Sequence, residues 1–364
     1  MSLAILGLGT AVPGAPVSQQ RAAQVAERLF PNTSERARVL SLLYRWTRVA
    51  SRHSVLADGS DDQPGSYQNF FPAWSEEGDG GPTTDQRMRL YEEHAAPLAI
   101  EASRSALDEA AIEPGSLTHV VTVSCSGFSA PGVDIALIKQ LGLASDVARS
   151  HIGFMGCHGA LNGLRVARSF VEADPEARVL LCAVELCTLH AHYGWDPEQI
   201  VANAIFSDGA AALVGTGAAG CQADTWQVVA SGSQIIADSE EAMTWRVRDH
   251  GFAMTLSARV PDLIREHLRP WLEAWLARNS LSIASVGSWA IHPGGPRILA
   301  AVGSAAGLDP DTLAPSYKIL EHYGNMSSPT ILFLFETLRR AGATRPIVAL
   351  GFGPGLAIEA AIIR

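Results

Sequence analysis

The sequence is poor in three features: paired cysteines, basic charge and long apolar runs. No two of its five cysteines form a Cys-x-x-Cys pair, so a disulfide scaffold is disfavoured and a reducing, cytoplasmic setting is expected. Cys182 and Cys187 have no ligand pair at zinc-finger spacing, so no metal site is predicted. No apolar run reaches the length of a transmembrane helix, so no membrane span is predicted. The five cysteines are Cys125, Cys157, Cys182, Cys187 and Cys221.

The charge balance is acidic, with a formal net charge of −10 over 364 residues. This charge argues against a surface for nucleic acid or for an anionic membrane. An anionic coenzyme would therefore need a local basic patch. Residues 2–11 are apolar without the basic region of a signal peptide, and we interpret them as a first strand. Arginines near the N-terminus could form the basic patch or a solvated helix face: Arg36, Arg38, Arg45, Arg48 and Arg52.

What the sequence does contain is a cysteine in an unusual setting. Cys157 ends the segment Gly153-Phe-Met-Gly-Cys157, and an amphipathic run over residues 160–172 follows at once. This pattern predicts a tight turn that delivers the thiol to a helix N-terminus, where backbone N–H groups and the helix dipole stabilise a thiolate. A buried structural cysteine is the alternative.

Two later segments carry residue types that complement a nucleophilic thiol. An apolar strand over residues 286–291 ends at His292, which precedes a Pro/Gly turn and is placed for proton transfer. Asn325 precedes a helix over residues 331–340, and its amide could donate to a carbonyl oxygen that gains negative charge. His292 could instead cap the turn, and Asn325 could cap the helix. Cys, His and Asn together form a constellation for thioester chemistry.

The pattern of elements repeats along the chain. Residues 107–143 and 275–308 both consist of a helix end, a strand, a Gly/Pro turn and a second helix, at an offset of roughly 170 residues. This repeat predicts a duplicated α/β fold with an N-terminal half over 1–220 and a C-terminal half over 221–364. Because Cys157 belongs to the first half and its partners to the second, we expect the site between the halves.

Five spaced motifs make a family resemblance specific. The chain resembles type III polyketide synthases of bacterial type, in the chalcone and stilbene synthase family. The resemblance implies a thiolase-like fold with five αβαβα layers and a homodimer. The motifs occur in the family's order at residues 153–157, 204–212, 292–296, 324–328 and 351–355.

The resemblance also implies a chemistry. Cys157 would accept an acyl group from acyl-CoA, and His292 would pair with the thiol and lower the pKa of the cysteine. His292 and Asn325 would stabilise the enolate that malonyl-CoA forms on losing CO₂. No metal or redox cofactor is needed, since CoA thioesters are the substrates. Phe206 aligns with the aromatic gatekeeper between the coenzyme tunnel and the cavity.

Substrate specificity and coenzyme contacts are predicted from the same alignment. Small residues at Ala130 and Gly251 would leave room for a long acyl chain, as in alkylpyrone and alkylresorcinol synthases. Cysteines at Cys125 and Cys187 instead resemble tetrahydroxynaphthalene synthases, which use malonyl-CoA alone. The predicted cavity residues are Cys125, Ala130, Cys187, His190, Gly251 and Ser327, and the predicted coenzyme contacts are Arg45, Arg48, Arg52, Gly294 and Gly295.

Three other functions fit parts of the sequence. A ketoacyl-carrier-protein synthase III-like enzyme would use the same three residue types, although Phe206 and the turn at 351–355 argue against it. A Cys-His-Asn hydrolase fits the residue types but not the duplicated topology. A non-catalytic scaffold would have no need for the three residues together. Residues 58–85, rich in Gly, Asp, Pro and Ser with interspersed aromatics, predict a long loop held by its own aromatic side chains or by a partner subunit.

Overall fold

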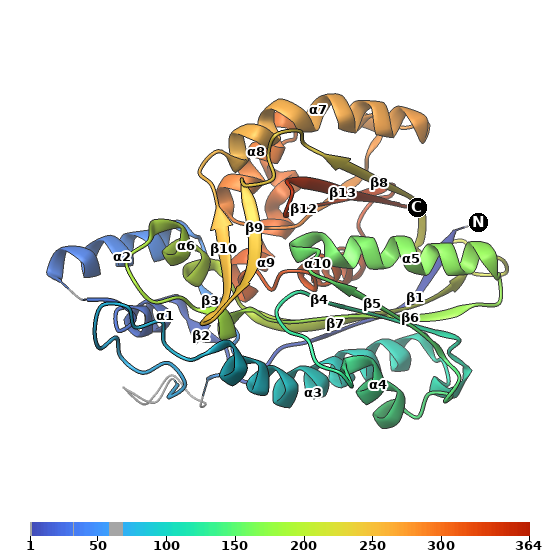
Figure 1. Ribbon diagram of the computed structural model, residues 1–364. Coiled ribbons are helices and arrows are strands. Elements are labelled where there is room, and N and C mark those ends of the chain that lie inside the picture. Colours follow the sequence, from blue (N-terminus) through green and yellow to red (C-terminus); the bar gives the residue numbers. More distant parts are fainter. Residues whose placement is uncertain (1, 32, 58–67) are drawn as a thin grey trace.

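The computed structural model describes residues 2–31, 33–57 and 68–364 (Figure 1). Its main strands are β1 (Leu3–Ala11), β4 (His119–Ser124), β5 (Ala148–Gly153), β6 (Arg178–Leu186), β7 (Asp208–Gly217), β8 (Gln227–Ile235), β11 (Ser288–Ile291), β12 (Ile347–Gly353) and β13 (Ala357–Ile363). They form one mixed nine-stranded sheet in the order β11-β12-β13-β8-β1-β7-β6-β4-β5. The predicted first strand and the predicted strand before His292 are both present.

The sheet consists of two related halves. Strand β4 begins at residue 119 and β11 at 288, and β6 begins at 178 and β12 at 347, so both pairs are 169 residues apart. The order β1-β7-β6-β4 in the first half corresponds to β8-β13-β12-β11 in the second. The halves meet where β1 pairs with β8, through Leu3 with Val228 and Ala4 with Gln227. The duplication predicted from the sequence is therefore visible in the topology, and the predicted division at 220/221 falls between β7 and β8.

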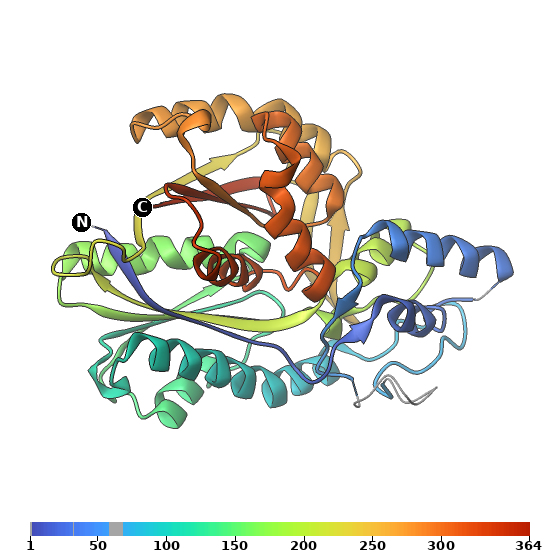
Figure 2. The same cartoon turned by 180° about the vertical axis from the view of Figure 1, so that it is seen from behind.

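Helices cover both faces of each half. Helices α3 (Thr84–Ala110) and α4 (Val133–Leu141) cover the outer face of the first half, and α7 (Val260–Arg278) and α8 (Pro296–Ala306) cover that of the second. Between the halves lie α5 (Gly159–Ala173) and α10 (Thr330–Arg340), as Figures 1 and 2 show from opposite sides. The five-layer αβαβα arrangement of a thiolase-like fold is thus confirmed. Helix α9 (Ala314–Tyr323) packs beside α10.

Packing explains why these segments take these forms. Strand β6 is buried from Val179 to Leu186 without alternation, as expected for a strand with helices on both faces. Helix α5 buries Leu161, Leu164 and other apolar residues at helical spacing in the central core. In β1, a Cβ on Gly9 would lie 2.2 Å from the backbone oxygen of Ala102, so glycine allows α3 to approach the strand closely.

A smaller group of elements gathers at one end of the sheet, near the C-terminal ends of β11 and β12 (Figures 1 and 2). These are α1 (Gln19–Ala26), α2 (Ser34–Trp46), α6 (Pro197–Ile205), the strand pair β2 (Val17–Ser18) and β3 (Ser51–Arg52), and the hairpin of β9 (Met243–Arg248) and β10 (Gly251–Leu256). Short 3-10 turns occur at Pro114–Ser116, Gly156–His158, Cys187–His190, Ile283–Ser285 and Pro310–Leu313. In the described part of the chain, no helix is both long and apolar enough to cross a membrane.

The predicted long loop is described from residue 68 onward, and its first ten residues, 58–67, lie outside the described residues. It is irregular up to Thr83, which caps α3. Phe71 is buried against Phe70, with ring centroids 5.0 Å apart, and Tyr193 donates a hydrogen bond to the backbone oxygen of Pro72. The described part of the loop is therefore anchored to its own chain.

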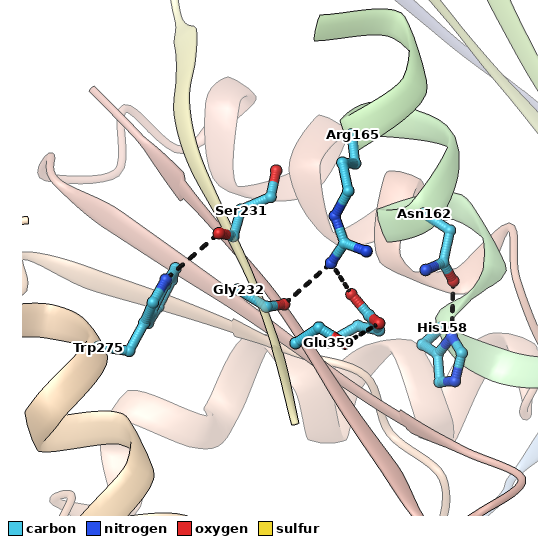
Figure 3. Close-up of polar contacts among 8 residues, drawn as sticks. His158, Asn162, Arg165, Ser231, Gly232, Trp275 and Glu359 are labelled. Atoms are coloured by element: carbon cyan, nitrogen blue, oxygen red, sulfur yellow. Dashed lines mark hydrogen bonds and ion pairs between the residues drawn. The ribbon is translucent and has the colours of Figure 1, made fainter. Parts of the chain in front are cut away.

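Polar contacts join the central helix to the second half of the sheet (Figure 3). Arg165 of α5 forms an ion pair with Glu359 of β13 and donates to the backbone oxygen of Gly232 of β8 at 3.2 Å. The Ser233 hydroxyl donates to the other oxygen of the Glu359 carboxylate at 2.6 Å. Because Glu359 is buried, these contacts fix the position of α5, the helix that begins beside Cys157.

Candidate active site

Cys157 lies at the start of α5, as the sequence predicts. It occupies the 3-10 turn Gly156–His158, which leads directly into the helix at Gly159. Gly156 has φ +67, and a Cβ there would lie 2.7 Å from Pro354 Cδ. A Cβ on Gly159 would lie 2.8 Å from Val123 Cγ1. The small residues around the thiol therefore allow the turn to pack tightly between the two halves of the sheet.

Asn325 directs its side-chain amide at the thiol. Its Nδ2 lies 3.7 Å from Cys157 Sγ, while its Oδ1 accepts a hydrogen bond from the Ser327 N–H at 2.8 Å. Helix α10 begins five residues later, at Thr330, so Asn325 does not cap it. The amide oxygen also lies 3.9 Å from the sulfur, but the hydrogen bond from Ser327 N holds it, which leaves the N–H groups to donate to a developing negative charge.

His292 follows β11 directly and faces the same cavity as Cys157. Its backbone N–H donates to Leu350 O at 2.8 Å, which continues the ladder between β11 and β12. Burial, with a smaller contribution from the neighbouring His158, lowers the pKa of His292 to about 3. Among the described residues, none makes a well-formed hydrogen bond with either imidazole nitrogen. The imidazole is therefore neutral in this site.

Burial dominates the pKa of the Cys157 thiol. Burial raises it to about 11, and hydrogen bonds from Ser327 and Asn325 offset this only in part. Removing the thiolate from water costs more than these two hydrogen bonds return. The lowering expected from pairing with His292 stays a prediction. Burial thus favours the neutral form of both side chains in this site.

Phe206 lies between two cavities. It lines the cavity that contains Cys157, His292 and Asn325, and with Met254 it also lines a second, neighbouring cavity. The second cavity extends to apolar residues of α1 and of the segment that follows it: Ala22, Val25, Ala26 and Leu29. The catalytic cavity is completed by Ala202, Ile205, Met243, Leu256, Gly294, Ile298 and Phe352.

Four of the predicted cavity residues lie close to these two spaces. Cys125 Sγ is 3.4 Å from the Ser327 hydroxyl, and Ser327 contacts the Cys157 thiol. Cys187 and His190 line the second cavity. The Nδ1 of His190 accepts from Phe252 N at 3.0 Å, so Nε2 carries the hydrogen and donates to Ser126 O at 2.6 Å. Burial lowers the pKa of His190 to about 3, which keeps its ring neutral.

The other two predicted cavity residues are corrected by the structure. Ala130 is exposed and lines neither cavity. Gly251 has φ +98 and faces the buried Arg87, whose Nη1 would lie 2.7 Å from an added Cβ. Gly251 therefore leaves no room for a substrate, and Ala130 lines surface hollows of about 290 and 260 Å³ that share no lining residue with the catalytic cavity. For Gly251, which begins β10, the short motifs did not fix the register of the β9–β10 hairpin.

Trp245 of β9 is a cavity residue that the sequence analysis missed. Its indole N–H donates to Cys125 O at 2.7 Å, and its ring centroid lies 6.3 Å from that of Phe206 and 5.4 Å from that of His190. It lines the second cavity beside these residues. A large aromatic residue between Thr244 and Arg246 in β9 was the available signal.

Glu185 was also missed, although a lone acidic residue in an apolar strand is a signal for a polar cluster. Its buried carboxylate accepts from Cys125 N at 2.9 Å, and from the Ser126 and Ser328 hydroxyls, each at 2.6 Å. Burial raises its pKa. Glu185 thereby holds the segment after β4 against the segment that carries Asn325, so it positions residues from both halves.

The predicted coenzyme contacts separate into two groups. Gly294 and Gly295 line a groove of about 520 Å³ that opens beside the catalytic cavity. Arg45 and Arg48 are exposed on and just after the last turn of α2. Arg52 is buried and donates to the backbone oxygens of Asn203 and Phe206, at 2.7 and 2.9 Å, so its predicted coenzyme contact is corrected to a support for the Phe206 segment. Arg297, which the sequence analysis did not select, lines the groove.

Comparison with known proteins agrees with this geometry. Residues 2–218 match the model for the N-terminal domain of chalcone and stilbene synthases, and residues 227–364 match the C-terminal domain. The chain is 33% identical to the alpha-pyrone synthesis polyketide synthase-like protein Pks18 of Mycobacterium tuberculosis, over 98% of this chain and 89% of that protein. It is 35% identical to the 1,3,6,8-tetrahydroxynaphthalene synthase of Streptomyces peucetius, over 73% of this chain and 72% of that enzyme.

Two solved structures have the same fold as this chain. The crystal structure of PKS-I from the brown alga Ectocarpus siliculosus superposes with a TM-score of 0.91 and 29% identity, covering 100% of this chain and 98% of that one. The C-terminal type III polyketide synthase domain of Steely1 from Dictyostelium superposes with a TM-score of 0.88. The chain therefore belongs to the chalcone and stilbene synthase family and is a type III polyketide synthase, an acyltransferase-type condensing enzyme.

Proposed function

We propose that the enzyme extends an acyl group bound to Cys157 with two-carbon units from malonyl-CoA. One observation carries the proposal: Cys157 of the first half and His292 and Asn325 of the second line the same cavity. The Cys157 proton passes to His292 as the sulfur attacks the acyl-CoA carbonyl. The CoA sulfur then leaves and takes the proton back from His292, so an acyl-cysteine and free CoA result.

The extension step uses the same residues differently. When malonyl-CoA loses CO₂, the electron pair moves to the thioester oxygen, and N–H groups of Asn325 and His292 donate to it. The enolate carbon then attacks the acyl carbonyl on Cys157, a carbon–carbon bond forms, and the Cys157 thiolate leaves. The product is a chain two carbons longer on CoA. Repetition and ring closure give the released polyketide, and no metal or redox group takes part.

For the starter we propose a fatty acyl-CoA, giving an alkylpyrone or alkylresorcinol. The apolar side chains at the far end of the second cavity suit an alkyl tail that passes Phe206 and Met254. The similarity to a protein named for α-pyrone synthesis supports the same class. The corrected positions of Ala130 and Gly251 no longer contribute to this proposal.

A second candidate uses malonyl-CoA both as starter and as extender. Trp245 places an indole ring beside Phe206, which narrows the route from the catalytic cavity to the second cavity. Cys125 beside Ser327 and the similarity to a tetrahydroxynaphthalene synthase favour the same candidate.

One experiment separates these functions. The enzyme is incubated with malonyl-CoA alone and with acyl-CoA starters of increasing length, and products are identified by mass spectrometry. Long-chain pyrones or resorcinols support the first proposal, and products from malonyl-CoA alone support the second. Cys157→Ala is the matched control, because it should abolish acyl-enzyme formation. Turnover only with malonyl-carrier protein, or simple thioester hydrolysis, would contradict both.

We also propose that the enzyme is a homodimer. Strand β5 is an edge of the sheet, and the exposed Phe128, Phe154 and Met155 lie close to its end and to the catalytic turn. Phe128 and Phe154 are neighbours, with ring centroids 6.1 Å apart. An apolar patch of this kind beside an unpaired strand edge is typical of a subunit interface. Light scattering at micromolar concentration tests it, and a monomeric mass would contradict it.

A further inference from the structure

Arg87, in the first turn of α3, is a fully buried cation that pairs with no carboxylate among the described residues. Burial lowers the pKa of Arg87 to about 10, so its guanidinium is still charged at neutral pH. A buried charge without a counterion is unfavourable unless other polar groups surround it. The contacts that compensate this charge therefore indicate what the side chain does.

The guanidinium donates to backbone oxygens of two segments that are far apart in the sequence. Its Nε donates to Pro82 O at 2.9 Å and its Nη2 to Gly80 O at 3.4 Å, both in the loop that precedes α3. Its Nη1 donates to Leu189 O at 2.8 Å and to Ala191 O at 2.9 Å, at the end of the 3-10 turn that follows β6. Because the planar fork of an arginine presents its donors in fixed directions, this one side chain ties the loop to the turn.

The β9–β10 hairpin packs against the same guanidinium. A Cβ on Gly251, the first residue of β10, would lie 2.7 Å from Nη1, so the strand approaches the cation closely. The hairpin also contacts the loop, since His250 Nδ1 donates to Gly81 O at 2.8 Å. From the loop, Phe71 places its ring centroid 5.1 Å from the guanidinium carbon, within the range of a cation–π contact. Loop, turn and hairpin therefore meet at one cation.

These three segments also form walls of the second cavity. The loop contributes Phe71, the turn contributes His190 and the hairpin contributes Met254. Arg87 is not one of the residues that line the described cavity, but it contacts Phe71 directly and holds the backbone on both sides of His190. It therefore supports these walls without touching a molecule bound between them.

The charge of Arg87 also acts on the ring of His190. Burial is the main cause of the lowered pKa of His190, and the nearby guanidinium adds to it. The ring must be neutral at this position, because Nδ1 needs a lone pair to accept from Phe252 N at 3.0 Å. An imidazolium would carry a hydrogen on both nitrogens and would lose this contact with β10. The charge thus favours the hydrogen bond that joins the turn to the hairpin.

We infer that Arg87 is a positioning residue that holds the loop, the turn and the hairpin together as one rigid wall of the second cavity, and that this wall limits the length of the acyl chain that the enzyme accepts. The inference rests on the proposed use of fatty acyl-CoA starters, whose alkyl tail would enter this cavity. Each methylene that fits adds to binding, whereas one methylene too many meets side chains that cannot move away. Without its tie the wall yields, and the length limit becomes less sharp.

The test measures how binding depends on chain length. Saturated acyl-CoA thioesters from acetyl to stearoyl are titrated calorimetrically into Cys157→Ala, which binds without turnover. Affinity should rise with length and then fall roughly 5- to 100-fold once the chain meets the wall, the scale of overpacking. Addition of Arg87→Lys keeps the charge but not the fork, and should reduce this fall to about twofold or less. Affinity for acetyl-CoA should stay the same.

Two further variants separate positioning from stability. Leu107→Ala is the matched control, because it removes a buried side chain at the other end of α3. It should destabilise the protein and leave the length limit as sharp as before. Gly251→Ala keeps Arg87 but places a methyl group 2.7 Å from its Nη1, and should weaken the length limit as Arg87→Lys does. It provides the test if Arg87→Lys does not fold.

Hydrogen exchange gives a measurement that is independent of any substrate. Amides of residues 70–82 and 187–191 should exchange faster in Arg87→Lys than in Leu107→Ala. Equal exchange in the two variants would overturn the inference. A length limit that is absent from Cys157→Ala, unchanged by Arg87→Lys or equally weakened by Leu107→Ala would overturn it as well. If the enzyme turns over no fatty acyl-CoA while Arg87→Lys still alters the length dependence of binding, the proposed starter is wrong and the role of Arg87 stands.

Discussion

The main chain of Asn325 pairs with that of Phe206 as an isolated parallel bridge. Asn325 N donates to Ile205 O at 2.9 Å, and Ser207 N donates to Asn325 O at 3.0 Å. The residue between the two cavities and the amide that faces Cys157 are therefore parts of one hydrogen-bonded unit, although they are far apart in sequence. A shift of the segment after α6 moves both.

Asn325→Ala should separate the two chemical steps. The backbone bridge with Phe206 remains, whereas the donor to the enolate oxygen is lost. Loss of one such donor typically lowers the rate about 10²- to 10³-fold. We expect CO₂ release from malonyl-CoA to fall by this factor, while acylation of Cys157, followed by intact-protein mass spectrometry, changes much less. Equal losses in both steps would show that the amide serves mainly to position the thiol.

The reactivity of Cys157 should depend steeply on pH. Because burial raises the pKa of the thiol to about 11, the thiolate is a minor species at pH 7 and increases about tenfold per pH unit up to that value. Carbamidomethylation of the peptide that contains Cys157, timed between pH 6 and pH 10, should accelerate throughout. A rate that is already constant above about pH 6 would instead reveal a preformed thiolate–imidazolium pair. Denatured protein provides the reference rate.

Trp245→Ala should widen the route between the cavities. The variant removes the indole beside Phe206 and His190 and the hydrogen bond to Cys125 O. We expect the ratio of long-chain to short-chain acyl-CoA turnover to rise about tenfold, the scale on which apolar pockets discriminate between substrates. Trp245→Phe is the control, since it keeps most of the bulk. A ratio that does not change in Trp245→Ala would mean that the alkyl tail takes another path.

Loss of the contact between the central helix and the second half should destabilise the fold. In Arg165→Ala, the buried Glu359 carboxylate retains the Ser233 hydroxyl but loses its cation. Arg165 is itself partly exposed, so we expect a decrease of about 1–3 kcal/mol in the free energy of unfolding, less than for a fully buried pair. Chemical denaturation measures it. Arg89→Ala, which breaks a pair with 76% and 69% exposed side chains, should cost about 0.5 kcal/mol or less.

The grouping of Cys157, His292 and Asn325 around one cavity could be predicted from the sequence because each lies in a short motif rich in small residues. Cys157 requires a tight turn before a helix, and His292 requires a strand end before a Pro/Gly turn, so local pattern alone locates both. The duplicated topology followed from the offset between matching segments. These are features that neighbours in the sequence determine.

The cavity walls could not be predicted in this way. Gly251 and Ala130 were expected to leave room for a long acyl chain because they are small, yet Gly251 packs against Arg87 and Ala130 is exposed. Trp245 reaches the wall of the second cavity because the β9–β10 hairpin packs there, and none of the five sequence motifs lies in that hairpin. Arg52 carries a charge typical of a coenzyme contact, but its guanidinium is directed inward to backbone oxygens. Such placements depend on tertiary packing between distant segments.

The division of the site between two halves of one sheet has a consequence for how this enzyme responds to warming. Strands β1 and β8 share only the two residue pairs that join the halves, so much of the registry between Cys157 and His292 is maintained by α5, α10 and the Arg165–Glu359 contact. The largely apolar core around these helices contains residues of both halves, among them Leu181 and Ile347. Warming therefore misaligns Cys157 and His292 only as this shared core loosens, so loss of activity is tied to the packing of the whole molecule.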